Sequence, residues 1–207
     1  MKCTLCGSVL INKKDKYYYD CNVCKALVKD DIYYLSADEE RTRYETHNND
    51  VTDIRYQSFT SPITNYVLKE FSPNHIGLDF GSGTGPVISS MLSNRGYKIH
   101  QYDPFFAPDK SVLENKFDYI VSCEVFEHFH NPKLEIDNLL SKLNTGGNLL
   151  VMTMIYNDEI DFRNWNYRDD DTHVFIYRKE TIEYIAKTRN LRIDELTDRF
   201  IAFKQVV

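Results

Sequence analysis

Four cysteines near the start of the chain form two C-x2-C pairs. Cys3 and Cys6 make the first pair, and Cys21 and Cys24 make the second, with fourteen residues between the pairs. Two residues between thiolates give a tight turn that aims both sulfurs at one point, and two such turns complete a tetrahedral Zn²⁺ site. Protein sulfurs fill all four positions, so the spacing predicts a structural zinc ribbon that leaves no open position for catalysis.

The same cysteines could instead form two disulfides or remain free thiols. A cytosolic location disfavours disulfides, and a segment of this size cannot bury a core of its own. Metal binding would then supply its folding free energy, about 10–16 kcal/mol in comparable peptides. The fifth cysteine, Cys123, stands alone in an apolar run, which favours a small buried residue at a strand end over a nucleophile.

A glycine-rich stretch, GLDFGSGTGPV, occupies residues 77–87. Such a loop lets a nucleotide approach the backbone closely. The dinucleotide fingerprint G-x-G-x-x-G needs a third glycine so that the following helix can pack on the strand. Gly81 and Gly83 fit that fingerprint, but Pro86 stands at the third glycine position. The pattern therefore argues against a dinucleotide with a pyrophosphate.

Two acidic residues mark the ends of neighbouring predicted strands. Asp103 follows Gly81 by 22 residues, and a carboxylate at that place can accept hydrogen bonds from both ribose hydroxyls. Asp103 alone does not separate a dinucleotide from another adenosine ligand. Glu124 ends a later strand at the carboxyl edge of the sheet, where ligands bind in open α/β sheets.

Strands and helices alternate from residue 74 onward, which is typical of a mostly parallel α/β sheet. Residues 109–115 would be a short third strand, and residues 157–178 a polar, aromatic loop. The remaining predicted strands are 75–80, 97–103, 117–123, 148–156, 191–197 and 200–206, and the predicted helices are 86–96, 131–147 (ended by Gly146 and Gly147) and 179–190.

The segment before this domain predicts helices. Ser36 and Glu39 form a capping box, and apolar residues from Ile63 to Phe71 recur at helical spacing. We expect these helices to connect the ribbon to the main domain and to cover its sheet. The predicted division is a zinc ribbon over residues 1–34, a helical linker or cover over 35–73, and a cofactor-binding domain over 74–207.

Composition narrows the class of protein. The net charge of −6 over 207 residues weighs against nucleic acid, because phosphate binding usually needs a surplus of Lys and Arg. The first residues carry no secretory signal, and the longest apolar run, residues 149–156, is too short to span a bilayer. We expect a soluble cytoplasmic protein without a membrane partner.

Taken together, the residues from 74 to the C-terminus resemble class I S-adenosylmethionine-dependent methyltransferases. The whole chain resembles a bacterial group of these enzymes with an N-terminal zinc ribbon, through RYETHNND, LDFGSGTGPV, YDPFFAPD, CEVFEHFHNP and YRDDDTHVFIYRKET. The resemblance implies a Rossmann-like, doubly wound seven-stranded sheet whose last strand is antiparallel. It also implies that S-adenosylmethionine is bound by Asp79, Gly81, Ser82, Gly83, Gly85, Asp103, Pro104, Cys123 and Glu124.

Methyl transfer from a sulfonium requires alignment of donor and acceptor, and a base helps only where the acceptor must lose a proton. The candidates for an acid, base or positioning role are His173 and His128. The candidates for acceptor contact are Trp165, Tyr167 and Arg168. His128 could instead bind a backbone carbonyl below the site, and Trp165 could be a core residue.

The acceptor is open at this point. A small molecule or metabolite is the leading prediction. The ribbon could instead present RNA or a protein, with residues 17–19, three tyrosines, as stacking faces. A non-catalytic cofactor-binding module is a third hypothesis. An NAD-dependent oxidoreductase is a fourth, which is disfavoured because Pro86 stands where the dinucleotide fingerprint has its third glycine.

Overall fold

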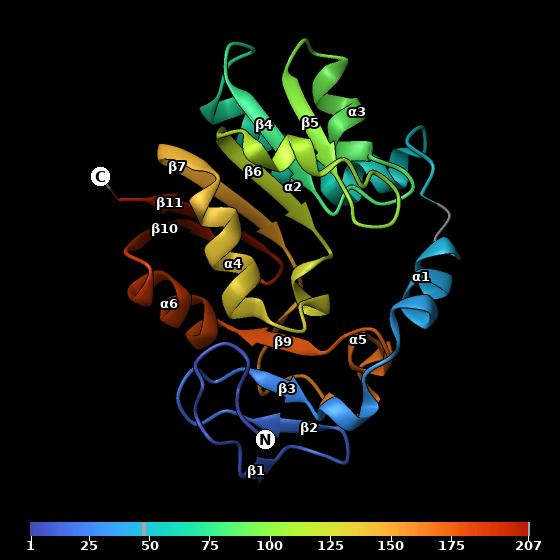
Figure 1. Ribbon diagram of the computed structural model, residues 1–207, viewed down its shortest axis with the longest axis vertical. Helices are drawn as coiled ribbons and strands as arrows, with labels where there is room; N and C mark the ends of the chain where they lie inside the picture. The colour runs from blue at the N-terminus through green and yellow to red at the C-terminus, as the bar shows by residue number, and fades with distance from the viewer. Residues whose placement is uncertain (47–48, 207) are drawn as a thin grey trace.

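The computed structural model describes residues 1–46 and 49–206 and contains two sheets, one above the other in Figure 1. The larger sheet has six strands in the order β10-β11-β7-β6-β4-β5. Their bounds are Leu191–Leu196 (β10), Phe200–Gln205 (β11), Leu143–Met152 (β7), Phe117–Cys123 (β6), Ile76–Phe80 (β4) and Lys98–Tyr102 (β5).

The centre of the larger sheet is parallel. β4 pairs in parallel with both β5 and β6, and β6 pairs in parallel with β7. β11 runs antiparallel to β7 and to β10, so the prediction of an antiparallel last strand is confirmed. Sheets of this kind have both faces covered and near-continuous apolar strands, and residues 119–122 of β6 are all buried.

The predicted third strand is absent from the described residues, so the seven-stranded count was wrong. Residues 110–114 form the 3-10 helix η2 (Lys110–Glu114) instead. The Asp109 side chain accepts a hydrogen bond from the Ser111 amide at 2.9 Å, and this N-cap favours a helical turn over an extended strand.

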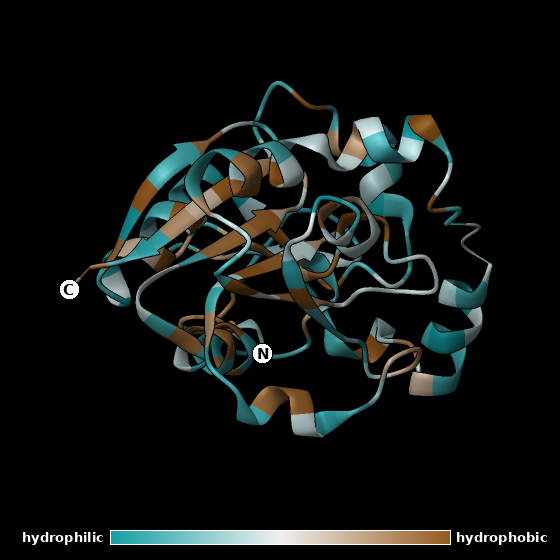
Figure 2. Ribbon diagram, turned by 90° about the horizontal axis from the view of Figure 1, so that it is seen from above, coloured by the Kyte–Doolittle hydropathy of each residue, from teal (hydrophilic) through white to brown (hydrophobic). Residues whose placement is uncertain are grey.

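Helices cover both faces of the larger sheet, and hydrophobic residues gather between the layers (Figure 2). On one face, Ile63 of α2 (Ile54–Glu70) and Leu92 of α3 (Val87–Ser93) share a buried cluster with Val121. On the other face, α4 (Pro132–Ser141) and α6 (Lys179–Thr188) share a second cluster with Ile120. Successive strand residues point to opposite faces, which explains the division of Ile120 and Val121 between the clusters.

The helix predicted to end at Gly146 and Gly147 ends earlier, at Ser141. Both glycines belong to the first part of β7, where Gly146 has a φ of 76°. A Cβ at Gly147 would lie 2.9 Å from the Asn144 carbonyl oxygen, so the close approach of backbone segments requires glycine there. These glycines therefore start a strand and do not cap a helix.

The smaller sheet combines the N-terminal ribbon with the segment that follows β7, in the order β1-β2-β3-β9-β8. Three strands come from the ribbon: β1 (Asn12–Lys13), β2 (Tyr18–Asp20) and β3 (Leu27–Lys29). The other two, β8 (Ile155–Tyr156) and β9 (Phe175–Arg178), come from the region after β7. The prediction that residues 157–178 are a loop was wrong at β9. This short apolar run is a strand because it pairs with β3, a tertiary contact that the local sequence does not show.

The ribbon contacts this C-terminal segment through several polar groups. Leu27 pairs with Ile176 in the antiparallel β3–β9 ladder, and the Lys29 amide donates to the Val174 carbonyl at 2.9 Å. The buried Tyr18 hydroxyl donates to the His173 carbonyl at 2.6 Å. The ribbon thereby fixes the backbone of the segment that carries His173.

The first helix, α1 (Ala37–Glu45), begins with the predicted capping box, in which the Glu39 amide donates to Ser36 and Glu39 accepts from the Ser36 amide. It buries none of its residues and lies away from the larger sheet (Figure 1). Only α2 of the two predicted linker helices covers the sheet.

We predict that Tyr18→Phe lowers the free energy of unfolding by about 1–3 kcal/mol, because it leaves the buried His173 carbonyl without its hydroxyl donor. Urea denaturation followed by tyrosine and tryptophan fluorescence measures this. Tyr33→Phe, a change at a partly exposed ring on the same segment, is the matched control. Equal midpoints for Tyr18→Phe and the wild type would contradict the role of this contact.

Candidate functional site

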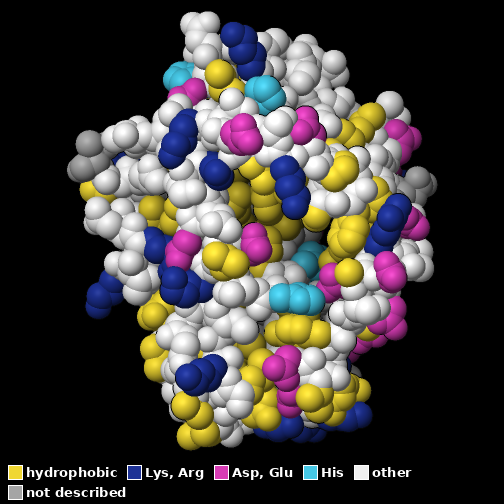
Figure 3. Space-filling view, viewed as in Figure 1, with side chains coloured by type: hydrophobic (Ala, Val, Ile, Leu, Met, Phe, Trp, Pro, Cys, Tyr) yellow, Lys and Arg dark blue, Asp and Glu magenta, His cyan; other side chains and the backbone are white. Residues whose placement is uncertain are grey.

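A cavity of about 630 Å³ opens at the carboxyl ends of the parallel strands. It lies between the larger sheet and the segment from α1 to α2, and the space-filling view shows a hollow with hydrophobic side chains in its floor (Figure 3). Parallel strands bring the residues that follow them to one edge of the sheet, where ligands of open α/β proteins bind. Its lining includes residues 80–84, 102–106, 123–125, 128–131, Glu40, Tyr44, Asn49, Tyr56, Phe59 and Glu135.

The glycine-rich loop after β4 forms one wall of the cavity. Gly81 and Gly83 have φ values of 75° and 65°, which side chains disfavour. A Cβ at Gly81 would also lie 2.4 Å from a methyl carbon of Val125. A Cβ at Gly85 would lie 1.7 Å from the Asn49 carbonyl oxygen, so glycine at position 85 lets the backbone before α2 close on the loop. Gly85 itself is not part of the lining.

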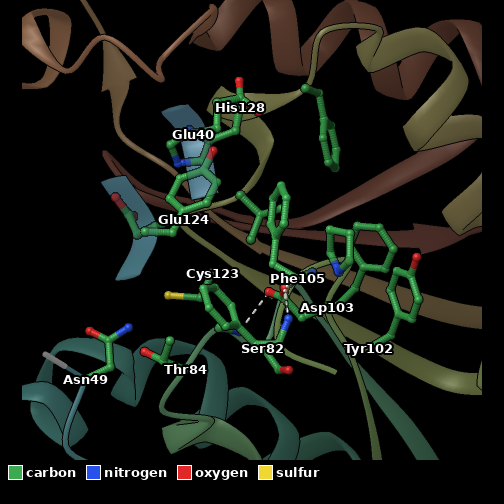
Figure 4. Close-up of a pocket in the computed structure, with 18 of the residues that line it drawn as sticks. Glu40, Asn49, Ser82, Thr84, Tyr102, Asp103, Phe105, Cys123, Glu124 and His128 are labelled. Atoms are coloured by element: carbon green, nitrogen blue, oxygen red, sulfur yellow. Dashed lines mark hydrogen bonds between the residues drawn. The ribbon is translucent and has the colours of Figure 1, made fainter. Parts of the chain in front are cut away.

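Asp103 joins the glycine loop to the turn after β5. One carboxylate oxygen accepts from the Gly83 amide at 3.0 Å, and the other accepts from the Phe105 and Phe106 amides at 2.8 and 3.0 Å. A carboxylate offers about four lone-pair sites, so one remains for a ligand hydroxyl. Asp103 and Pro104 both line the cavity (Figure 4), in agreement with the position expected for ribose-binding residues.

One further feature of this wall, the Ser82 side chain, fits a polar ligand. The Ser82 hydroxyl is buried and has no hydrogen-bond partner among the described residues, although Ser82 lines the cavity. Buried polar atoms are nearly always paired, so a ligand group that hydrogen-bonds Ser82 would satisfy it. The residues at this wall therefore fit a nucleoside with free hydroxyls.

Asp79 lies beneath the loop and not at the cavity surface. Its carboxylate is buried and accepts from the Ser89 hydroxyl of α3 at 2.7 Å. Burial is the main cause that raises the pKa of Asp79 to about 6, and the hydrogen bond from Ser89 opposes this rise. Asp79 thus fixes the loop to α3, and direct ligand contact is not supported by its position.

Cys123, the last residue of β6, and Glu124, which follows it, both line the cavity. Glu124 has a φ of 52°, a conformation that is uncommon outside glycine and often occurs at functional sites. Burial, together with the nearby charge of Glu127, raises the pKa of Glu124 well above its usual range. Burial likewise raises the pKa of the Cys123 thiol, which disfavours a nucleophilic thiolate.

The structure brings the two candidate histidines together but gives only one of them access to the cavity. His128 lines the cavity, whereas His173 is 8% exposed and lies behind it. Their ring centroids are 4.8 Å apart. The Nδ1 atom of His128 is 3.0 Å from the Thr172 carbonyl oxygen, so a backbone hydrogen bond and a place in the cavity wall coexist. Burial lowers the pKa of His173.

The residues expected to touch the acceptor, Trp165, Tyr167 and Arg168, lie outside the cavity lining. Trp165 packs against Tyr156 and Tyr167 at centroid distances of 5.8 and 5.0 Å. The Tyr167 hydroxyl hydrogen-bonds Thr153 at 2.9 Å. Arg168 pairs with Asp15 of the ribbon. Their side chains stabilise the junction between the ribbon and the segment after β8, because that pairing buries them away from the cavity.

Aromatic residues that sequence reasoning missed form much of the cavity. Tyr44 comes from α1, Tyr56 and Phe59 from α2, and Phe105 from the turn after β5. The FF pair within YDPFFAPD was a signal for Phe105 and Phe106, since two adjacent aromatic residues follow a strand end. The tyrosines on α1 and α2 carried no such signal, because only tertiary packing brings them to the cavity.

The four ribbon cysteines converge, and all of their Sγ atoms lie within 4.8 Å of one another. Cys3 and Cys24 are 3.5 Å apart at Sγ, as are Cys6 and Cys21. Four thiolates at the usual Zn–S distance of about 2.3 Å would be about 3.8 Å apart. The donor set and spacing therefore fit Zn²⁺, and the pairing at 3.5 Å is no disulfide.

The turns around these cysteines are equivalent. The residue after each second cysteine, Gly7 or Lys25, has a positive φ of 75° or 62°, and its amide donates to the first cysteine of its pair. The Ser8 hydroxyl lies 3.1 Å from the Cys6 sulfur and 3.2 Å from the Cys21 sulfur. Such outer hydrogen bonds orient metal-bound thiolates.

The tyrosines of residues 17–19 do not form an exposed stacking surface. Tyr18 is 1% exposed, and the Tyr17 ring packs edge-on against Tyr33 and beneath the Arg168 guanidinium. The expectation that these rings present stacking faces to RNA is therefore corrected.

Among the described residues, no helix combines the length and the apolar character needed to cross a bilayer.

Comparison with known protein families gives one match. A family model described as "Methyltransferase domain" matches residues 53–196 of the chain. This range begins at the N-cap of α2 and ends in β10, so it includes every wall of the cavity except the contribution of α1 and Asn49. A search of the curated proteins gave no match.

Solved structures with a similar fold share little sequence with this chain. Magnesium protoporphyrin IX methyltransferase from Synechocystis PCC 6803, solved with bound SAH, superposes with a TM-score of 0.57 at 13% identity, over 84% of this chain and 97% of that chain. TehB from Haemophilus influenzae gives 0.53 at 16% identity, over 72% of this chain and 67% of that chain. An O-methyltransferase family protein from Burkholderia thailandensis gives 0.53 at 13%, over 89% and 65%. These similarities show the shared α/β fold.

We predict that Asp79 makes stability fall as pH rises through mild acidity. Its folded-state pKa of about 6 lies above the value of 3.8 expected in the unfolded chain. The stability from the protonated form is complete below about pH 4 and is lost as the pH rises through 6. From pH 4 to pH 7 the wild type should lose about 3 kcal/mol relative to Asp79→Asn, as measured by denaturant unfolding at each pH. A constant difference between the two proteins would refute this.

Proposed function

This chain belongs to the methyltransferase domain family and is an S-adenosylmethionine-dependent methyltransferase, and we propose that its acceptor is a small molecule bound in the cavity described above. The observation that carries the proposal is the meeting of the glycine loop, Asp103 and Glu124 at one cavity. A single open edge of the sheet supplies all of these groups, so donor and acceptor would bind side by side.

The cofactor would be held by the wall that contains the glycine loop and the turn after β5. Asp103 has a lone-pair site for a ribose hydroxyl, and the Ser82 hydroxyl is a free hydrogen-bonding group. Pro104 and Cys123 supply surface on either side. S-adenosylmethionine supplies an electrophilic methyl group on a sulfonium.

The remaining chemistry belongs to residues of this chain. Aromatic side chains such as Tyr44 and Phe59 exclude water from the cavity, and alignment of the acceptor in such a site supplies most of the rate enhancement that methyl transfer needs. His128, Glu124 and Glu40 are titratable groups on the cavity side away from Asp103 (Figure 4). The His128 Nδ1 atom lies 3.0 Å from the Thr172 carbonyl oxygen, and this contact holds the ring in the cavity wall, where it can position the acceptor.

The size and lining of the cavity favour a small acceptor. Sites for small molecules typically measure about 300–1,000 Å³ and are mostly apolar with a few polar groups, and this cavity measures about 630 Å³. The net charge of −6 and the burial of Tyr18 speak against RNA. An RNA or protein acceptor is therefore an outcome for the experiment to detect and not the reading that we favour.

We propose further that the four cysteines hold a structural Zn²⁺ and that the chain divides into a ribbon (1–34), a helical cover (35–73) and a cofactor-binding domain (74–207). The convergence of the four sulfurs supports the metal. The β3–β9 ladder joins the ribbon to the third part, so the ribbon supports the segment that carries His173.

The acceptor class is tested with labelled S-adenosylmethionine and an extract divided into small-molecule, RNA and protein fractions. We expect methylation in the small-molecule fraction and no RNA binding in a salt titration, because phosphate contacts would give a steep salt slope. Label in RNA or protein would refute the small acceptor, and a complete lack of transfer with intact cofactor binding would refute catalysis.

We predict that Asp103→Asn weakens binding of S-adenosylmethionine and S-adenosylhomocysteine at least tenfold. The change removes the negative charge and replaces one of the two acceptor oxygens with an NH₂ group, so either the Gly83 amide or the amides of Phe105 and Phe106 lose their acceptor. Hydrogen bonds to charged groups contribute about 1.5–3 kcal/mol. Isothermal titration calorimetry measures the effect, with Asp109→Asn on η2 as control. Wild-type affinity in Asp103→Asn would contradict the assignment, and tight binding of NAD would favour an oxidoreductase.

We predict that Cys24→Ser releases the smaller sheet and leaves the larger one folded. Loss of metal removes the folding free energy of the ribbon, so amide hydrogen exchange should increase in β3 and β9 and stay unchanged in β6. Cys123→Ser is the matched control. If metal analysis of the wild type finds no zinc, or if exchange in β9 is unaltered, the proposed support of β9 by the ribbon is wrong.

A further inference from the structure

A second group of metal-binding residue types lies behind the cavity, away from the cysteines. It consists of Glu127 and His128, at the end of the 3-10 helix η3 (Phe126–His128), and His173, which precedes β9. One ligand atom from each of the three lies within 4.8 Å of the other two. The Val174 amide donates to the Glu127 carbonyl at 2.8 Å, and this bond brings together segments that are distant in sequence.

Backbone carbonyl oxygens fix the tautomer of both imidazole rings. His128 Nδ1 lies 3.0 Å from the Thr172 carbonyl oxygen, and His173 Nδ1 lies 2.6 Å from the Tyr167 carbonyl oxygen. A carbonyl oxygen can only accept, so Nδ1 carries the hydrogen in each ring and Nε2 of the neutral ring keeps its lone pair. Histidines that bind metals through Nε2 show this arrangement, in which the other ring nitrogen donates to a carbonyl or carboxylate.

In the Glu127 carboxylate, one oxygen has no hydrogen-bond partner among the described residues. Its side chain is fully buried, and one carboxylate oxygen accepts from the Thr153 hydroxyl at 2.9 Å. The other, Oε1, has no hydrogen-bond partner in the part of the chain that the structure describes, and it lies 3.9 Å from His128 Nε2. A buried carboxylate oxygen without a partner is costly, and a cation between it and the two rings would remove that cost.

Other groups around the cluster favour a cation as well. Glu124 adds a second buried carboxyl group, whose Oε1 also lacks a hydrogen-bond partner among the described residues. The Tyr167 hydroxyl bonds the Thr153 hydroxyl at 2.9 Å, so a chain of hydroxyls orients Glu127 from behind. Two imidazole rings and acidic side chains thus surround the space between the three ligand atoms.

We propose that Glu127, His128 and His173 bind a first-row divalent cation such as Zn²⁺ or Mn²⁺. Two imidazoles and one carboxylate suit such ions better than Mg²⁺ or Ca²⁺, which prefer oxygen ligands. Ligand bonds of about 2.1 Å would draw the three donor atoms closer together. Three protein ligands leave a coordination position open, and His128 places it at the cavity wall.

Such an ion would serve the acceptor side of the cavity. A cation lowers the pKa of a hydroxyl or water bound to it, so it would favour an acceptor oxygen that must lose a proton. This consequence rests on the proposed function, whereas the metal site itself does not. The site differs from the four cysteines in ligand chemistry, which allows the two to be measured separately.

The test uses the full-length protein with its cysteine site loaded with one equivalent of Zn²⁺ and then titrated with Co²⁺. We expect one further equivalent to bind, with visible d–d bands and without the sulfur-to-cobalt charge-transfer band of thiolate ligands. Glu127→Gln, which keeps the shape of the side chain, and His173→Ala should each lose this equivalent. His100→Ala, at an exposed histidine of β5, should retain it.

Equal cobalt binding by the wild type and both variants would overturn the proposal. Because His173→Ala could disturb the smaller sheet, a second measurement needs no variant: wild-type crystals soaked in CoCl₂ should show an anomalous peak between the three side chains. Absence of this peak would overturn the proposal as well. Calorimetry with S-adenosylmethionine on the same sample distinguishes this failure from a failure of the proposed function, because cofactor binding uses the opposite wall.

Discussion

The parallel pairing of β4, β5, β6 and β7 is the constraint from which the site follows. Parallel strands direct all of their carboxyl ends to one edge, so the glycine loop, Asp103 and Glu124 meet there although they lie far apart in sequence. The covering helices then close the edge into a cavity. The Asp103 carboxylate completes this arrangement, because it accepts amides from the loops that follow both β4 and β5.

The second constraint is the β3–β9 ladder, which joins the N-terminal ribbon to the segment that carries His173, outside the cavity lining. The backbone of β9 and the preceding residues is held by ribbon groups, among them Tyr18 and Lys29. Residues 172–174 in turn contact the end of η3 through His128 and Glu127. Backbone hydrogen bonds therefore link the cysteine-containing ribbon to the segment that carries the two histidines, His128 and His173.

Buried acidic groups are the most unusual feature of the interior. Asp79 is satisfied by a hydroxyl from α3 and acts as a structural anchor, with a raised pKa caused by burial. Glu124 and Glu127 lie close together without a basic side chain hydrogen-bonded to either among the described residues, and each leaves one oxygen unpaired. Burying such groups without partners destabilises a folded protein. Both residues lie beside the cavity, where a bound ligand or cation could supply the missing partner.

The sequence by itself determined the local chemistry. The cysteine spacing, the glycine loop with Pro86, the capping box at Ser36 and the alternation of strands and helices depend on neighbouring residues, and the structure has each of them. The sequence predicted the wrong secondary structure for two short segments. The run at 110–114 became a 3-10 helix under an Asp109 cap, and Phe175–Arg178 became a strand because β3 is beside it.

Only the tertiary structure decided which polar residues reach the cavity. Trp165, Tyr167 and Arg168 are attractive acceptor contacts by residue type, yet the ribbon junction buries them elsewhere, and helix packing brings Tyr44 and Tyr56 to the cavity instead. His128 and His173 likewise became neighbours through a contact between segments over forty residues apart. Residue type limits the chemistry a side chain can do, but burial and orientation arise from long-range packing, which local sequence does not encode.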